Sequence, residues 1–233
     1  MTQLTLYSAE VCPYAQRTRI VLHEKNIVHE LVELNLDDLP EWFLALTPPR
    51  RVPVLRHDDF ILWESATINE YLDGSFPGNP LRPANERDRA VMRNEIRHFD
   101  NVFLPVFYKL LFEQDERQQA VLREETQRGF EFLERRLETI QGNGPYWLGT
   151  EMSLADAAMW PFFERLCVFD HYRGLSLPAT CMRLQRWFDV VAERASASST
   201  AHDLAYFVPY YAHYADGTAN GLSAQAFRAG AAN

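Results

Sequence analysis

Short runs in the first third of the chain alternate between apolar and polar residues. A period of two residues is typical of β-strands, because successive side chains of a strand point to opposite faces of a sheet. Between these runs the apolar residues recur at helical spacing, and Pro13 stands at the first position of one helix, where its missing N–H costs no hydrogen bond. The pattern predicts strands at 3–7 and 29–34, two short strands within 52–65, and helices at 13–25, 40–46 and 64–76.

The order of these elements predicts a small α/β unit. A helix between the first two strands implies a right-handed parallel crossover. The polar link inside 52–65 is a hairpin signal and implies antiparallel pairing. The segment "PGNPLRPANE" at 77–86 then interrupts all periodicity with three prolines and one glycine. We therefore predict the first unit at 1–78.

The rest of the chain shows only helical periodicity, so the second unit, predicted at 86–214, is all-helical. Pro105 predicts a bend in its first helix, and Pro209 is expected to break its last one. The small and polar residues of 215–233 predict a disordered tail. The helices of this unit are predicted at 92–110, 122–140, 153–170, 179–195 and 204–214.

The composition limits the kinds of protein that this chain can be. A net charge of −9 argues against a nucleic-acid surface, which needs a basic stripe. No apolar run reaches about 18 residues, the minimum for a membrane-spanning helix. The first ten residues have neither the basic nor the apolar region of a secretory signal. Three cysteines without metal-type or disulfide-type spacing indicate a reducing, cytoplasmic setting and no metal site.

Cys12 is the strongest candidate for chemistry. In "YSAEVCPYAQRTR" it follows the first predicted strand and directly precedes Pro13, so it lies at a helix N-terminus. Unpaired N–H groups and the helix dipole favour a thiolate there, which predicts a thiol pKa below the usual value of about 8.5. The alternative is a buried thiol that acts only as a small hydrophobic residue. Cys167 lies within an apolar helical run, Cys181 lacks a preceding strand, and Ala15 takes the place of a resolving thiol.

Five stretches together resemble the cytosolic glutathione transferases, most closely the omega class: "CPYAQRTRIVL", "PEWF", "VPVL", "ESATINEYLD" and "MSLADAAMWPFFERL". The resemblance runs from Leu4 to about Tyr211. It implies a thioredoxin-like domain that binds glutathione, followed by a helical-bundle domain that carries the acceptor site. It also implies glutathione as co-substrate and a homodimer as the working form.

The resemblance further implies roles for individual residues. Cys12 is the nucleophile, and Val52, before a cis Pro53, offers its backbone to the cysteinyl part of glutathione. Glu64 and Ser65 hold the ammonium and the α-carboxylate of the γ-glutamyl group. Judged without the resemblance, these two residues also suit an ordinary first turn of a helix.

The omega pattern is incomplete in two places. Leu39 stands where omega enzymes carry a lysine for the glycyl end of glutathione, and Arg51, or alternatively Arg50, is the candidate for supplying that charge. Tyr7 ends the first strand, where other classes of the family carry an activating tyrosine. The alternation of the strand favours packing of Tyr7 instead.

Other side chains have both a functional and a structural interpretation. Ser153 and Asp156 form an S-x-x-D capping box, which we interpret as a folding element. Arg17 and Arg19 could assist a thiolate, although a solvated helix face is the simpler interpretation. An aromatic set either lines an acceptor pocket or forms core at helical spacing: Tyr14, Phe103, Phe107, Tyr108 and Phe207, with Tyr210.

The sequence therefore predicts a glutathione-dependent thiol transferase or reductase. Cys12 would carry glutathione as a mixed disulfide and act on disulfides, glutathionyl adducts or dehydroascorbate, so the partner is a small hydrophobic or disulfide acceptor. Two alternatives stay open. One is a conventional transferase that conjugates glutathione to electrophiles, and the other is a non-catalytic protein of the same fold that binds a partner.

Overall fold

The computed structural model describes residues 3–219, 221 and 224, and its first part is a four-stranded mixed sheet with helices on both sides. The strand order is β2-β1-β3-β4, with β1 and β2 parallel and the other two pairs antiparallel. The predicted crossover and hairpin are thus confirmed. The strands are β1 (Leu4–Ser8), β2 (Glu30–Glu33), β3 (Val54–His57) and β4 (Phe60–Trp63), and the helices are α1 (Pro13–Glu24), α2 (Glu41–Leu44) and α3 (Ser65–Ser75).

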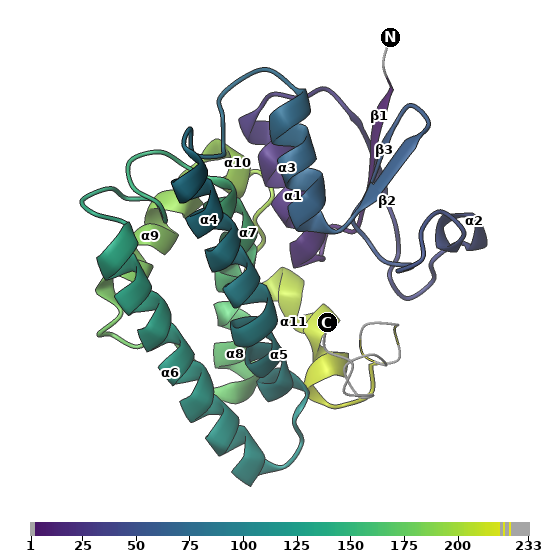
Figure 1. Cartoon of the computed structure of the whole chain (residues 1–233). Coiled ribbons are helices and arrows are strands. Elements are labelled where there is room, and N and C mark those ends of the chain that lie inside the picture. Colours follow the sequence, from purple (N-terminus) through teal and green to yellow (C-terminus); the bar gives the residue numbers. More distant parts are fainter. Residues whose placement is uncertain (1–2, 220, 222–223, 225–233) are drawn as a thin grey trace.

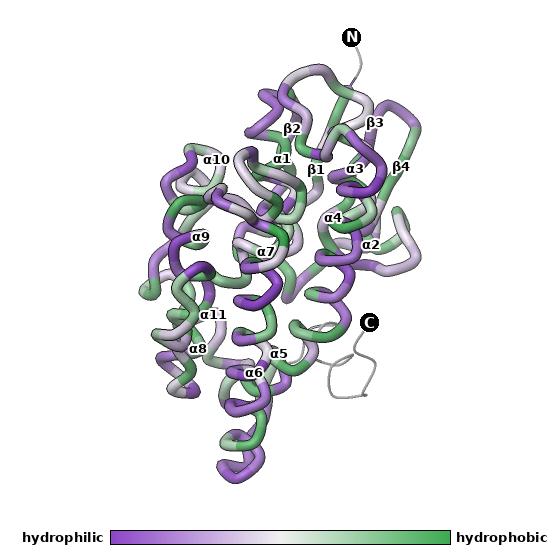
Figure 2. The backbone as a smooth tube through the Cα atoms, turned by 60° about the vertical axis from the view of Figure 1, so that its left-hand side comes forward, coloured by the Kyte–Doolittle hydropathy of each residue, from purple (hydrophilic) through white to green (hydrophobic). Residues whose placement is uncertain are grey.

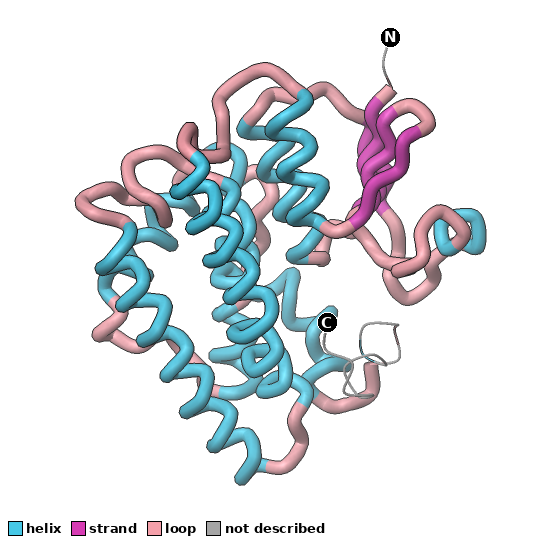
Figure 3. Tube along the Cα trace, in the orientation of Figure 1, coloured by secondary structure: helices cyan, strands magenta, loops and turns pink. Residues whose placement is uncertain are grey.

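Helices α1 and α3 cover the face of the sheet that looks toward the helical part, whereas α2 lies apart from both (Figures 1 and 3). The all-helical part follows a connection of irregular backbone, as the prolines of 77–86 predict. It comprises α4 (Glu86–His98), the π-helical turn η1 (Phe99–Phe103), α5 (Leu104–Phe112), α6 (Glu116–Ile140), α7 (Leu154–Glu164), α8 (Leu166–Arg173), α9 (Met182–Ala192), α10 (Ala195–Ser198) and α11 (Leu204–Ala215). A thioredoxin-like domain before a helical domain is the predicted fold class.

Three helices differ from the prediction. The bend expected at Pro105 takes the form of the wide turn η1 just before it, so the missing N–H falls where the helix is already irregular. The helix expected at 153–170 is two helices that meet at Arg165. Pro209 does not break α11, which runs through it from Leu204 to Ala215.

One hydrophobic core runs through both parts of the molecule. Helix α1 packs against α3 on one side and against α7 of the helical part on the other. Figure 2 shows the accompanying pattern on α6, whose trace alternates between hydrophilic and hydrophobic positions along its length. Ion pairs cross between the parts, among them Arg17 with Asp100, Glu24 with Arg194 and the more exposed Glu70 with Arg93. The two parts therefore share one core rather than meeting at a wet surface.

The capping box predicted at the start of α7 is present. Ser153 Oγ accepts from the backbone of Ala155, and the Asp156 carboxylate accepts from the backbone N–H of Ser153 at 2.7 Å. The fully buried Asp156 also accepts from the Trp147 N–H and from the indole N–H of Trp187, both at 2.7 Å. Its partners are structural, which confirms the interpretation of this motif as a folding element.

Most of the predicted tail lies outside the described residues. Within it, Ala215 ends α11, Thr218 hydrogen-bonds to Asp216, and Ala219 and Ala224 are buried. The disordered tail stays a prediction; at the described positions Ala219 also donates to the His213 carbonyl at 2.8 Å.

Candidate active site

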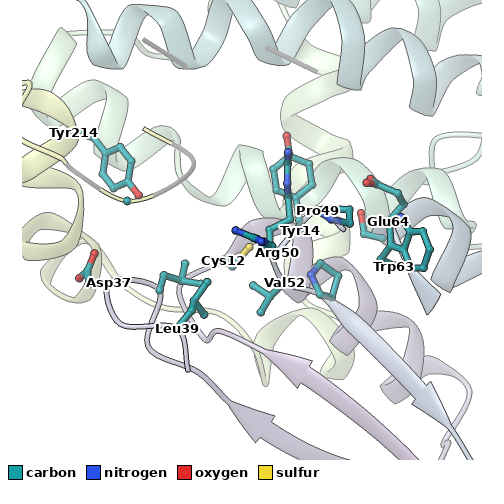
Figure 4. Close-up of a pocket in the computed structure, with 15 residues that line it drawn as sticks. Cys12, Tyr14, Asp37, Leu39, Pro49, Arg50, Val52, Trp63, Glu64 and Tyr214 are labelled. Atoms are coloured by element: carbon teal, nitrogen blue, oxygen red, sulfur yellow. The ribbon is translucent and has the colours of Figure 1, made fainter. Parts of the chain in front are cut away.

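Cys12 caps the N-terminus of α1 directly after the turn that leaves β1. Its N–H donates to the Ala9 carbonyl at 2.9 Å, and its own carbonyl accepts the first helical bond, from Gln16, at 3.0 Å. The side chain is 9% exposed and lines a cavity of about 120 Å³. In Figure 4, Val52, Trp63 and Glu64 lie on one side of Cys12, and Asp37 and Tyr214 lie on the other. The Cys12 thiol therefore lies between two groups of residues, which form two different walls around it.

The charge state of Cys12 depends on opposing effects. Burial raises the pKa of the thiol above its usual value, and this is the largest effect. The backbone N–H groups of Ala15 and Tyr14 and the charges of Arg165 and Arg19 lower the pKa. The prediction of a depressed pKa is wrong, because the sequence reveals a helix N-terminus but not the depth at which the thiol is buried.

The polar wall of the cavity consists of Val52, Glu64, Ser65, Arg50 and Arg51. The Val52–Pro53 peptide bond is cis, as the resemblance implies. Val52 precedes β3 and makes no backbone hydrogen bond within the described part of the chain, so its N–H and C=O can pair with an extended ligand. A peptide bound here would lie across the end of the strand.

Glu64 and Ser65 stand at the first turn of α3. Glu64 caps the helix with φ of 68°, a left-handed conformation that costs a residue with a side chain about 1–3 kcal/mol. Glu64 is exposed at the cavity, while Ser65 is buried at the first helical position. A hydroxyl and free N–H groups at a helix start suit a carboxylate, and Glu64 suits an ammonium group.

Ser65 is supported from behind by Arg17. The Arg17 guanidinium is 1% exposed, lies 3.4 Å from Ser65 Oγ, and forms an ion pair with Asp100 at 2.5 Å. It also donates to the Ala158 carbonyl at 2.6 Å. Arg19 holds the turn before Cys12 through the carbonyls of Ala9 and Glu10. The expectation of a solvated face is wrong for Arg17, which is buried where α7 covers α1. Arg19 is partly exposed and bonds to the end of β1 and the turn after it.

Arg50 and Arg51 both line the cavity together with Leu39. Arg50 has φ of 54°, and Figure 4 places its guanidinium beside Cys12. Two arginines therefore line the cavity near Leu39, the position at which the resemblance implies a lysine. That Arg51 supplies the charge stays a prediction, with Arg50 as the alternative.

The second wall is a tyrosine wall formed by Tyr206, Tyr210 and Tyr214 of α11. Their i, i+4 spacing puts them on one side of the helix. They line a cavity of about 700 Å³ together with Asp37, which also lines the Cys12 cavity. Burial raises the pKa of both Tyr210 and Tyr214, so their hydroxyls are neutral hydrogen-bonding groups. The wall is aromatic and polar at once.

Most of the aromatic residues predicted for an acceptor pocket lie elsewhere. Phe103, Phe107 and Phe207 are at most 5% exposed and belong to the hydrophobic core, so the pocket interpretation is wrong for them. Spacing alone does not distinguish a core phenylalanine from a pocket one. Tyr14 does line the Cys12 cavity. Burial, with Tyr211, Tyr14 and Cys12 nearby, raises the pKa of Tyr108 well above its usual range.

Tyr7 packs as a strand residue, as expected. It is 8% exposed and its ring lies 5.7 Å from that of Trp42 and 6.0 Å from that of Phe43. Among the described residues, no group of three His, Cys, Asp or Glu side chains could hold a metal ion. None of the described helices is long and apolar enough to cross a membrane.

Sequence reasoning missed Asp37, Trp63 and Tyr214 as cavity residues. The regular spacing of Tyr206, Tyr210 and Tyr214 was a usable signal, but it does not show which wall α11 forms. Asp37 lies in an irregular segment, and only the tertiary fold brings it to Tyr214.

The chain matches two family descriptions, "Glutathione S-transferase, N-terminal domain" over residues 6–80 and "Glutathione S-transferase, C-terminal domain" over residues 86–190. It is 34% identical to glutathione S-transferase omega-1 of Sus scrofa, over 70% of this chain and 67% of that protein. It is 35% identical to omega-2 of Homo sapiens, over 71% and 68%. Among solved structures, glutathione transferase Omega 3C of Trametes versicolor aligns with a TM-score of 0.82 and 28% identity over 91% of this chain and 90% of that one. The chain therefore belongs to the glutathione S-transferase family and is an omega-like glutathione transferase.

Proposed function

We propose that this enzyme is a glutathione-dependent thiol transferase that works through Cys12. The observation that carries the proposal is the position of the Cys12 thiol, which caps α1 and lines the cavity whose polar wall suits a γ-glutamyl peptide. Tyr7, the alternative activating group, is packed against Trp42 and Phe43. Cysteine is thus the nucleophile that the site provides.

The reaction has two exchange steps. The Cys12 thiolate attacks the glutathionyl sulfur of a mixed disulfide, a Cys12–glutathione disulfide forms, and the acceptor leaves as a thiolate that takes a proton from water. A second glutathione thiolate then attacks the glutathionyl sulfur of that disulfide. Oxidised glutathione leaves and the Cys12 thiolate is restored, so one disulfide is consumed and one is formed.

Glutathione is the co-substrate in this proposal, and the polar wall is its binding site. The backbone of Val52 pairs with the cysteinyl part, Ser65 and the first turn of α3 bind the α-carboxylate, and Glu64 binds the ammonium group. Arg51 or Arg50 binds the glycyl carboxylate. The tyrosine wall receives a small hydrophobic or disulfide acceptor.

The test replaces Cys12 with serine, whose hydroxyl is hardly ionised near neutral pH. We expect Cys12→Ser to lose disulfide-linked glutathione transfer by at least about 100-fold while still binding reduced glutathione. Incubation of the wild type with oxidised glutathione should add one glutathionyl group to the peptide that contains Cys12. Cys167→Ser is the matched control and should keep full activity, because Cys167 is half-buried within α8.

Full turnover in Cys12→Ser would show that the thiolate mechanism is wrong. If the variant instead kept only conjugation of glutathione to an electrophile, the conventional transferase would be the correct assignment. Absence of any glutathione binding in the wild type would favour the non-catalytic alternative.

We also propose that the protein is a cytoplasmic homodimer. The three cysteines are free, which suits a reducing compartment. Phe60 and Trp63 of the edge strand β4 and Val102 of η1 are exposed apolar side chains that a second copy could cover. Light scattering after gel filtration should give twice the mass of the chain, and a monomer would contradict the proposal.

A further inference from the structure

Arg165 is a fully buried arginine at the junction between α7 and α8. Its exposed fraction is 0%, and its backbone leaves the helical conformation with ψ of 2°, so it ends one helix and begins the next. A buried guanidinium needs partners for its N–H groups, because an unpaired buried charge is costly. Its partners show what the residue does.

The guanidinium reaches across the molecule to the segment that carries Cys12. Nη2 donates to the carbonyl of Val11 at 2.9 Å, and Nη1 donates to Oε1 of Gln16 at 2.7 Å. Val11 directly precedes Cys12, and the N–H of Gln16 bonds to the Cys12 carbonyl. Arg165 therefore holds the chain immediately before the thiol and one helical turn after it.

The remaining bonds tie this contact to the helical part. Nη1 also bonds to the Glu164 carboxylate at 3.1 Å, and Nε donates to the Tyr211 hydroxyl at 3.1 Å. Glu164 in turn accepts from the Gln16 amide at 2.8 Å and from the His202 N–H at 2.7 Å. The guanidinium also lies 4.7 Å above the ring of Phe207. These hydrogen-bond partners and the Phe207 ring surround the guanidinium and fix its position.

We propose that Arg165 is a positioning residue for the thiol transferase reaction, which holds the Cys12 turn in place and supplies a fixed positive charge to the Cys12 thiolate. The inference rests on the proposed function for its catalytic meaning. Its geometry does not depend on that function, because the bonds to Val11 and Gln16 are internal to the protein. The hydrogen bonds of Arg165 go to Val11, Gln16, Pro161, Glu164 and Tyr211 and not to the Cys12 thiol, so we assign it a positioning role.

The charge has a measurable consequence. Arg165 lowers the pKa of the Cys12 thiol against the larger opposing effect of burial. Arg19 acts in the same direction, but it is partly exposed and lies 3.4 Å from Glu33.

Other titratable or charged groups also lie around Cys12 among the described residues. They are Tyr14 and Arg17 of α1, Tyr108 of α5, Glu164 of α7, Tyr210, Tyr211 and Tyr214 of α11, Glu64 beside α3, and Asp37, Arg50 and Arg51 of the loops.

Arg173 offers a matched control on the same helix. It is also buried, and it donates to the carbonyls of Leu110 and Ala215 at 2.9 and 2.6 Å. Among the described residues, the Arg173 guanidinium bonds to neither α1 nor the segment before it. Loss of Arg173 should therefore lower stability as a buried arginine does, but it should not alter the thiol.

The experiment measures the alkylation rate of Cys12 by iodoacetamide as a function of pH, with the modified peptide identified by mass spectrometry. We expect Arg165→Met to move the midpoint upward by about one pH unit and to slow alkylation at pH 7 by roughly tenfold. Arg165→Lys, which keeps the charge, should stay within about 0.3 unit of wild type. Arg173→Met should leave the midpoint unchanged.

A folded Arg165→Met protein with the wild-type midpoint would overturn the proposal, as would an equal shift in Arg173→Met. If Arg165→Met does not fold, Glu164→Gln supplies the answer. Removal of the counter-charge should move the midpoint downward and speed alkylation at pH 7 by about threefold, and an unchanged or raised midpoint would overturn the proposal. Retained turnover in Cys12→Ser would refute the proposed function, whereas these midpoints would still test Arg165.

Discussion

The two walls on either side of Cys12 differ in how they are built. The polar wall comes from short segments of the α/β part, and its residues Val52, Glu64 and Ser65 are close in sequence. The tyrosine wall comes from α11, more than a hundred residues later. The polar wall offers backbone groups and charges in fixed geometry, whereas the tyrosine wall offers rings and neutral hydroxyls. One wall suits a single defined ligand, and the other suits a class of acceptors.

The largest expected effect concerns the polar wall. The double variant Glu64→Gln, Ser65→Ala should weaken glutathione binding by about 2–4 kcal/mol, the scale of lost charge-assisted hydrogen bonds. Calorimetry with glutathione and with cysteinylglycine makes the comparison, because cysteinylglycine lacks the γ-glutamyl group and its weak binding should hardly change. Equal losses for both ligands would mean that the fold was damaged. No loss for glutathione would mean that these residues only begin α3.

The second prediction concerns the support behind the polar wall. Asp100→Asn leaves the buried Arg17 without its carboxylate and should lower the free energy of unfolding by about 2 kcal/mol, less than for a fully buried pair because Asp100 is 25% exposed. Urea denaturation measures the change. Glu70→Gln is the matched control, since its pair with Arg93 is exposed and should contribute less than about 1 kcal/mol. Comparable losses in the two variants would contradict the structural role given to Arg17.

The sequence could predict the polar wall better than the tyrosine wall. Val52, Glu64, Ser65 and Cys12 stand beside strand ends and helix starts, which local patterns reveal, and the structure brings all four to one cavity. The sequence favoured a solvated position for Arg17, because helical spacing cannot show that α7 covers α1.

The tyrosine wall was harder to predict because it depends on tertiary placement. Phe103, Phe107 and Phe207 have the same helical spacing as Tyr210, yet they are buried in the core. The break between α7 and α8 has no local signal in the sequence. The hydrogen bond from Arg165 to Val11 has none either, since these two residues are far apart in sequence. The division into an α/β part and an all-helical part was predictable because it depends on the order of elements, whereas the thioredoxin-like assignment came from the resemblance.

The third prediction concerns pH and the thiol between the two walls. Because burial raises the pKa of the Cys12 thiol, the thiolate is a minor form at neutral pH. The rate of alkylation should therefore rise about tenfold from pH 7 to pH 8 and continue to rise beyond about 8.5, the usual cysteine value. Stopped-flow alkylation measures this profile. A plateau below pH 8 would mean that the helix N-terminus and the arginines outweigh burial.

The smallest expected effect concerns the tyrosine wall. Tyr214 lines both cavities, so Tyr214→Ala removes one ring from the acceptor side without touching Val52, Glu64 or Ser65. We expect the KM for an aromatic disulfide to rise by about five- to tenfold, equivalent to the roughly 1 kcal/mol of one aromatic contact. The affinity for glutathione should stay within about twofold, since a side chain that makes no contact with a ligand contributes little to its binding. A small aliphatic disulfide is the matched substrate, because it cannot stack on a ring and its KM should hardly change. If glutathione affinity fell together with the aromatic KM, the two walls would be one site, and the division between a fixed ligand and a variable acceptor would be wrong.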